Sequence, residues 1–62
     1  MGMRIVKGDK VKYLDLEGTA ISNPYMYITD RETYIDVYFS EVREIMTIQI
    51  NSLEKINWYE YR

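Results

Sequence analysis

Residue types that could do chemistry are few in this chain. Histidine and cysteine are both absent from its 62 residues, which removes the usual nucleophile–base pairs, the usual zinc sites and disulfides. Its three glycines cannot form a phosphate loop or a dinucleotide fingerprint. Its ten acidic side chains lie mostly in expected turns or on polar faces, which argues against a paired general acid and base. We therefore predict a protein that is not an enzyme and that uses no cofactor and no metal.

Tyrosine stands out among the remaining residue types, with seven copies. Its ring is apolar while its hydroxyl needs water or a partner, so tyrosine suits both half-buried strands and interfaces. Tyr34 and Tyr38 are expected on the outer face of a strand, beside Thr47, Gln49 and Asn51 of a neighbouring strand. Such a face fits a protein interface, base stacking, or cross-strand pairing that only stabilises the sheet. The residues predicted to contact a protein partner are Tyr34, Tyr38, Gln49, Tyr59 and Tyr61.

Charge is distributed unevenly, although the net charge is only −2. Residues 1–12 hold four basic side chains and one acidic one, whereas residues 13–62 hold four basic and nine acidic side chains. The acidic sum argues against broad electrostatic capture of nucleic acid. A basic strip of Lys7, Lys10 and Lys12 still fits a phosphate contact and makes nucleic-acid binding the alternative function. Lysines on an edge strand also guard against aggregation, which is the competing interpretation of this strip.

Short β-prone segments must position these residues. Lys10 to Tyr13 alternates polar and apolar side chains, as a half-buried strand does. The alternation of apolar and polar side chains shifts by one residue at Leu14, and this shift in parity predicts a bulge or bend near Tyr13 and Leu14. A turn is expected next, followed by a second strand over residues 19–22. The residues expected in this turn are Asp15, Glu17 and Gly18.

The middle of the chain has the clearest pattern. A turn signal at Asn23-Pro24 precedes a strand expected over residues 25–29 and a polar connection over 30–33. Strict alternation of apolar and polar side chains predicts a strand over residues 34–39. Residues 40–47 admit two structures, a turn followed by a strand or a short helix that begins after Ser40.

The last third of the chain is expected to close the sheet. Met46, Ile48 and Ile50 share one face of a strand. Leu53 and Ile56 have the spacing of a one-turn 3-10 segment, and residues 57–61 can form a final strand. We predict an all-β fold, a small barrel of five to six short antiparallel strands with a one-turn 3-10 segment near the C-terminus.

The length of the chain predicts a single domain over residues 1–62, in which residues 1–3 are disordered or partly a cloning remnant before a natural start at Met3. A chain this short buries only about 60% of the surface that its unfolded form exposes, so help from a second subunit is expected. No apolar run approaches the ~20 residues that span a bilayer, and the N-terminus has no apolar core of a secretory signal. We expect a cytoplasmic protein that does not enter the membrane.

The order of these parts resembles the small SH3-like barrels, including the Tudor and KOW-type modules. The resemblance is carried by Lys7-Gly8-Asp9-Lys10-Val11-Lys12, by Gly18-Thr19-Ala20-Ile21 and by the ending Leu53-Glu54-Lys55-Ile56. In such barrels, loops and the end of the last strand commonly meet in an aromatic groove or cage, which would bind a cationic or proline-rich ligand. The residues that would form this cage are Tyr25, Tyr27, Trp58, Tyr59 and Tyr61, with Trp58 alternatively a plug of the core or its rim.

Within this class the chain is similar to the plasmid-borne type B dihydrofolate reductases, short SH3-like barrels that act as tetramers around a central pore. Gln49 and Ile50 match two pore positions of that family, while Asn51 stands where the family has tyrosine. This resemblance implies reductase activity as a second alternative. Size, acidity and tyrosine content also resemble accessory or inhibitor proteins of phages and mobile elements. The sequence thus predicts a small non-enzymatic binding, adaptor or inhibitor module with a protein partner, which includes a second copy of itself as a homo-oligomer.

Overall fold

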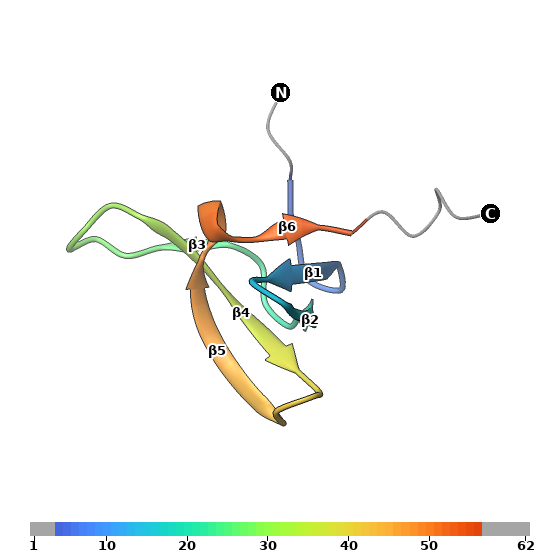
Figure 1. Ribbon diagram of the computed structural model, residues 1–62. Helices are drawn as coiled ribbons and strands as arrows, with labels where there is room; N and C mark the ends of the chain where they lie inside the picture. The colour runs from blue at the N-terminus through green and yellow to red at the C-terminus, as the bar shows by residue number, and fades with distance from the viewer. Residues whose placement is uncertain (1–3, 57–62) are drawn as a thin grey trace.

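The computed structural model describes residues 4–56 and shows an all-β domain (Figure 1). All strand pairs in it are antiparallel, and one 3-10 turn lies near the C-terminus. The predicted all-β class, strand number and 3-10 turn are therefore confirmed. The elements are β1 (Lys10–Tyr13), β2 (Leu16–Ala20), β3 (Tyr25–Met26), β4 (Thr33–Phe39), β5 (Glu44–Gln49), the 3-10 helix η1 (Ile50–Ser52) and β6 (Glu54–Lys55).

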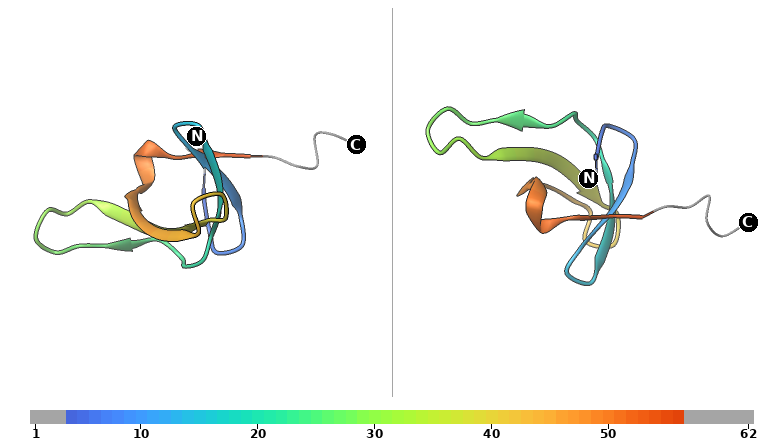
Figure 2. Two further views of the ribbon diagram at one scale, coloured as in Figure 1. Left: turned by 60° about the horizontal axis from the view of Figure 1, so that its bottom comes forward. Right: turned by 90° about the horizontal axis from the view of Figure 1, so that it is seen from above.

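Strand β4 is the centre of the sheet. Along one edge it pairs with the whole of β5, from Tyr34 opposite Gln49 to Phe39 opposite Glu44. Along its other edge it pairs first with β3 and then with β2. The sheet continues from β2 through β1 to β6. The views in Figure 2 show the β4–β5 hairpin and the β1–β2 hairpin running in different directions, so that the sheet curls around the core.

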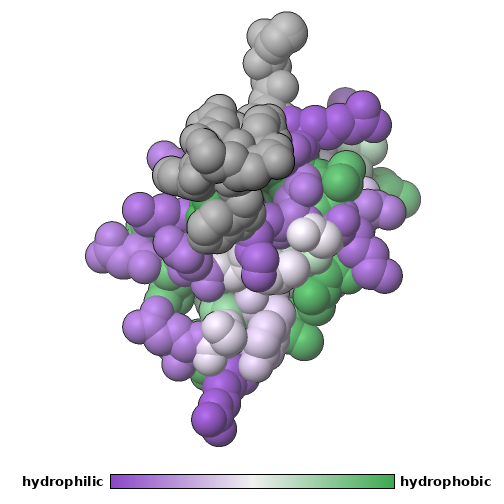
Figure 3. All heavy atoms as spheres, turned by 90° about the vertical axis from the view of Figure 1, so that its right-hand side faces the viewer, coloured by the Kyte–Doolittle hydropathy of each residue, from purple (hydrophilic) through white to green (hydrophobic). Residues whose placement is uncertain are grey.

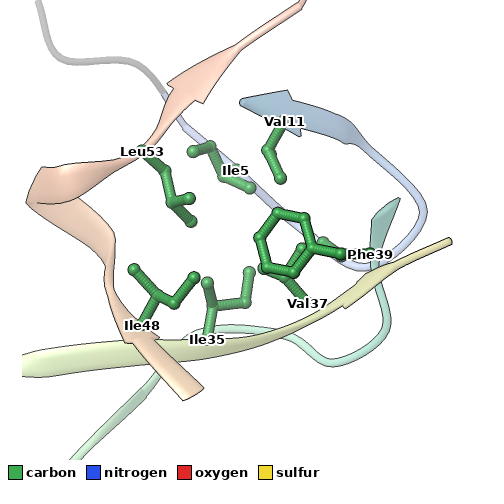
Figure 4. Close-up of a cluster of buried hydrophobic side chains, with 8 residues drawn as sticks. Ile5, Val11, Ile35, Val37, Phe39, Ile48 and Leu53 are labelled. Carbon is green, nitrogen blue, oxygen red and sulfur yellow. The ribbon is translucent and has the colours of Figure 1, made fainter. Parts of the chain in front are cut away.

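Buried apolar side chains fill the inside of the curled sheet (Figure 4). Strand β4 contributes every second residue, as its alternation predicted, and β5 contributes Ile48. Full burial of such a side chain stabilises the fold by roughly 1.5–3 kcal/mol. Ile5, which precedes β1, is also buried, and no periodic pattern indicated it. The core consists of Ile5, Val11, Ala20, Ile35, Val37, Phe39, Ile48 and Leu53.

The turn between β1 and β2 differs from the prediction. Leu14 and Asp15 form a two-residue turn in which Leu14 has a φ of 55° and is 76% exposed. The parity shift at Leu14 is therefore a turn, not a bulge within a strand. The turn predicted at Asp15, Glu17 and Gly18 is wrong in part, because Glu17 and Gly18 lie inside β2. A Cβ on Gly18 would lie 2.7 Å from the carbonyl oxygen of Tyr38, so close packing of β2 on β4 requires a glycine here.

Several other element boundaries are corrected. Strand β3 covers only Tyr25–Met26, and η1 precedes Leu53 where the prediction placed it after. The short helix weighed for residues 40–47 is wrong, because turn residues 40–43 lead directly into β5. The final strand predicted over residues 57–61 lies outside the described residues. Within residues 4–56, no helix is long and apolar enough to cross a membrane.

Candidate protein-binding surface

Three tyrosine rings meet where β3 and β4 pair. Tyr25 of β3 lies opposite Tyr34 of β4 in the register, and Tyr27 follows β3 directly. The ring centroid of Tyr27 lies 4.8 Å from that of Tyr34 and 5.7 Å from that of Tyr25. Tilted ring pairs at these distances stabilise each other beyond their buried area. The rings therefore form one packed cluster on the outer face of the sheet, opposite the core.

Two carboxylates accept hydrogen bonds from the hydroxyls of Tyr25 and Tyr34. The Tyr25 hydroxyl donates a hydrogen bond of 2.7 Å to Asp36 Oδ1, and the Tyr34 hydroxyl donates one of 2.8 Å to Asp30 Oδ2. Thr47 of β5 also donates to Asp36 Oδ1, at 2.8 Å. These bonds raise the pKa of both tyrosines, because the neutral hydroxyl is the donor to a carboxylate. Both hydroxyls thus remain protonated and anchored at neutral pH.

Asp30 is itself positioned by the loop between β3 and β4. The backbone N–H of Glu32 donates to Asp30 Oδ1 at 3.0 Å. This bond, followed by the bond from the Tyr34 hydroxyl, lowers the pKa of Asp30 because both donors favour the ionised carboxylate. The loop carboxylate is therefore charged and tied to the ring cluster.

Tyr38 and Ile45 extend this outer face toward the other end of β4. They lie directly opposite each other in the β4–β5 register and are 38% and 62% exposed. Tyr27 is 45% exposed, whereas Tyr25 and Tyr34 are half-buried. The more exposed members are therefore Tyr27, which contacts both anchored rings, and the pair of Tyr38 and Ile45 further along β4. We call the set Tyr25, Tyr27, Tyr34, Tyr38 and Ile45 the tyrosine face.

The structure brings together some of the predicted contact residues. Gln49 is half-buried opposite Tyr34, and its Nε2 donates to Glu32 Oε1. Tyr34 and Gln49 thus lie side by side, and Tyr38 lies further along the same face of β4. Tyr59 and Tyr61 lie outside the described residues, as does Trp58.

Sequence reasoning grouped Tyr25 and Tyr27 in an aromatic cage with Trp58, Tyr59 and Tyr61, which lie outside the described residues. It missed Asp30, Asp36 and Ile45. The parity of the hairpin carried a usable signal for the two tyrosines, because a connection over 30–33 sets Thr29 opposite Tyr34 and thus puts Tyr25 and Tyr27 on the face of Tyr34. The observed connection is longer, and it sets Tyr25 itself opposite Tyr34. Ile45 also follows from parity, since it alternates with the inward Met46. No signal in the sequence identified which carboxylate accepts from which hydroxyl.

The basic strip is not an edge strip. Strand β1, which carries Lys10 and Lys12, pairs with β2 on one side and with β6 on the other, so the edge-guard interpretation is wrong for these two residues. Lys12 lies in register between Glu17 and Glu54, and Lys10 Nζ donates to Thr19 Oγ1 at 3.0 Å. Lys7 lies on the loop before β1 and is exposed. The face turned to the right in Figure 1 is largely hydrophilic, with hydrophobic residues along one margin (Figure 3).

A shallow hollow of about 300 Å³ adjoins both Lys10 and Tyr38. Register places Lys10 opposite Thr19 and Thr19 opposite Tyr38, so these side chains form one row across β1, β2 and β4. Among residues 4–56, no three acidic side chains lie close enough to hold a metal ion. The lining residues are Lys10, Glu17, Gly18, Thr19, Tyr38, Ser40 and Ile56.

Comparisons of the chain with protein-family models, with curated proteins and with solved structures give no match. The function of the chain is therefore inferred from its own surface.

Proposed function

We propose that this chain is a small protein-binding module, an adaptor or inhibitor, that contacts its partner through the tyrosine face. The observation that carries this proposal is the pair of Tyr38 and Ile45, which lie exposed and opposite each other on the same face of the sheet as the anchored aromatic rings. Aromatic side chains contribute a large share of the affinity in protein interfaces.

The fixed positions of the tyrosine rings favour a role in binding over a role in sheet stability alone. The hydroxyls of Tyr25 and Tyr34 are fixed by Asp36 and Asp30, and Tyr27 packs between the two rings. A ring that is already held loses little conformational freedom when a partner covers it, so more of the contact energy appears as affinity. Cross-strand pairing alone would not require an exposed Tyr27 or an exposed Ile45.

The charges beside the rings favour a basic partner segment. Asp30, Glu32 and Asp36 all contact the tyrosine face or its neighbour Gln49 through hydrogen bonds. Against these three acidic side chains the same loop holds one basic residue, the exposed Arg31, so the local charge balance is acidic. Carboxylates near ring faces attract Arg or Lys side chains, which also stack on tyrosine. The same carboxylates repel phosphate, which argues against nucleic acid at the ring cluster of Tyr25, Tyr27 and Tyr34.

We also propose that the strands form an SH3-like barrel. The chain order of a β1–β2 hairpin, a long β4–β5 hairpin, a 3-10 turn and a short last strand paired with β1 supports this. The SH3-like architecture hosts many binding modules, so the proposal agrees with a binding function by analogy. A cytoplasmic location and an accessory role in a phage or mobile element belong to the same proposal.

Partner capture tests the function directly. The chain, immobilised from its N-terminal end, is presented to a cytoplasmic extract beside the variants Tyr38→Ala and Leu14→Ala, and the retained proteins are compared. Leu14 is the matched control because it is exposed and apolar but lies in the β1–β2 turn, away from the tyrosine face. We expect a partner retained by the unmodified chain and by Leu14→Ala, and lost from Tyr38→Ala. Equal retention by both variants would contradict the proposal.

Nucleic-acid binding is the second candidate, because the row from Lys10 through Thr19 to Tyr38 joins a basic side chain to an exposed ring. Affinity for a single-stranded oligonucleotide would then fall steeply with salt. Exchange of Lys10 and Lys12 for Glu would abolish this affinity. Salt-insensitive binding, or none, would remove this candidate.

A further inference from the structure

The outer edge of β5 is unpaired within residues 4–56. In the described part of the chain, β5 pairs only with β4, and Figure 1 shows β4 along one of its edges and no other labelled strand along the opposite one. The uninterrupted register with β4 contains no bulge. A row of backbone N–H and C=O groups at such an edge can pair with another strand.

The direction of the backbone groups identifies which residues face this edge. The carbonyl of Asp36 accepts from Ile21 at 2.9 Å and its N–H donates to Ser22 Oγ, so Asp36 directs both groups away from β5. Direction alternates along a strand, so Ile35 and Val37 direct theirs toward β5. The N–H and C=O groups of their partners Ile48 and Met46 are therefore hydrogen-bonded to β4 and are not available at the free edge. The residues at the free edge are Ile45 and Thr47 with both groups, and Gln49 with its N–H and with a carbonyl that, as the N-cap of η1, also accepts the first bond of that turn.

This edge lacks the protection that natural edge strands carry. Residues 45–50 contain no charge, no proline and no glycine. Two other edge strands among residues 4–56 are protected by short length or by charge, since β3 has two residues and β6 consists of Glu54 and Lys55. Short or charged edges discourage pairing, whereas a longer uncharged edge invites it.

We propose that β5 pairs antiparallel with β5 of a second copy of this chain, across a twofold axis at Thr47. In this register Thr47 faces the partner's Thr47, and Ile45 faces the partner's Gln49. The Thr47 pair exchanges two hydrogen bonds. In each Ile45–Gln49 pair, the N–H of Gln49 donates to the carbonyl of Ile45, and the N–H of Ile45 donates to the second lone pair of the Gln49 carbonyl, whose first lone pair serves η1. Shifting the register by two residues in either direction leaves part of this row unpaired. The Thr47-centred register is thus the one that uses the whole edge.

The side chains are compatible with this pairing. Met46 would lie opposite the partner's Ile48 on the inner face, and Ile45 would lie between Tyr38 and the partner's Gln49 on the outer face. Glu44, the one charged residue of β5, would face the partner's Ile50, so no like charges meet. In a second copy paired this way, no like charges meet, and inward side chains lie opposite inward ones and outward side chains opposite outward ones. This inference goes beyond the proposed function, and it would join two tyrosine faces into one bivalent surface.

Amide hydrogen exchange of the unmodified chain over a concentration series is the first test. We expect the N–H groups of Ile45, Thr47 and Gln49 to exchange slowly when concentrated and quickly after dilution. Those of Met46 and Ile48 should stay slow throughout, because β4 holds them. A light-scattering mass of twice 7.5 kDa should accompany the slow state. A monomer at every concentration, or outward N–H groups whose exchange does not follow concentration, would overturn the proposal.

A proline variant and its matched control give the second test. Ile45→Pro removes an N–H that faces the free edge and leaves the ladder to β4 intact. Ile45→Ala removes the same side chain but keeps the N–H. Because each dimer loses two such donors, we expect Ile45→Pro to weaken dimerisation at least about tenfold relative to Ile45→Ala. Equal dimerisation of the two variants refutes the edge register. If Ile45→Pro fails to fold, the exchange measurement decides alone.

Discussion

Replacement of Gly18 by alanine tests the packing of β2 on β4. The added Cβ would lie 2.7 Å from Tyr38 O, 2.7 Å from Val37 Cγ1 and 2.8 Å from Phe39 Cδ1. Side chains can rotate away from such a contact, but the carbonyl oxygen of Tyr38 belongs to the centre of the sheet and cannot. Overpacking of this kind costs about 1–3 kcal/mol, and the backbone contact places the cost at the upper end.

That cost is large for a domain of this size. Stabilities of roughly 0.05–0.15 kcal/mol per residue give a total of about 3–9 kcal/mol for such a chain. A loss of about 3 kcal/mol lowers the midpoint of thermal unfolding by roughly 12–24 °C. Far-UV circular dichroism against temperature measures the shift, with Glu17→Ala as the control, since Glu17 is the exposed neighbour on β2. A Gly18→Ala midpoint within about 2 °C of the unmodified chain would refute this account of Gly18.

Three further predictions concern the core and the anchored rings. Phe39→Ala should lower the free energy of unfolding by about 3–5 kcal/mol in a urea titration, and a smaller loss would mean that the core has collapsed around the gap. Tyr25 and Tyr34 should ionise later than free tyrosine in an absorbance titration, and their contribution to stability should be lost as pH rises through their raised pKa. Asp30 acts in the opposite direction: its contribution is present above the ordinary aspartate pKa and lost as pH falls through the lowered one, and Asp30→Asn should remove that part of the acid dependence.

Local patterns in the sequence predicted much of this fold. The alternation of Ile35, Val37 and Phe39 gave β4 and its buried face, because a half-buried strand has a period of two. Parity alone then placed Tyr34 and Tyr38 on the outer face. These predictions hold because each depends on residues that are neighbours along one strand.

Features that depend on contacts between distant strands could not be predicted. Gly18 was expected in a turn because glycine marks turns, but its role is to leave room for β4, which only the fold reveals. Leu14 occupies the left-handed region without a glycine or asparagine signal. Lys10 and Lys12 were expected on an edge strand, and only the pairing of β1 with β6 shows that they are not.

For the candidate site too, features within one strand could be predicted and contacts between strands could not. The outer tyrosines of β4 followed from periodicity, whereas the anchoring of Tyr34 by Asp30 and of Tyr25 by Asp36 depends on the β3–β4 register and on the loop that returns between them. A change of one or two residues in the length of the loop would alter which side chains can form a hydrogen bond across the hairpin. A sequence pattern does not fix that length without the structure.

Affinity for a partner captured on the immobilised chain, measured for Tyr38→Ala and for Leu14→Ala under one condition, tests the central claim most directly. Both substitutions shorten an exposed side chain, and only Tyr38 belongs to the tyrosine face. The account predicts that Tyr38→Ala weakens binding at least about tenfold, the loss of roughly 1.4 kcal/mol or more that is typical of an interface anchor, while Leu14→Ala leaves it unchanged. Equal affinities of the two folded variants would contradict it.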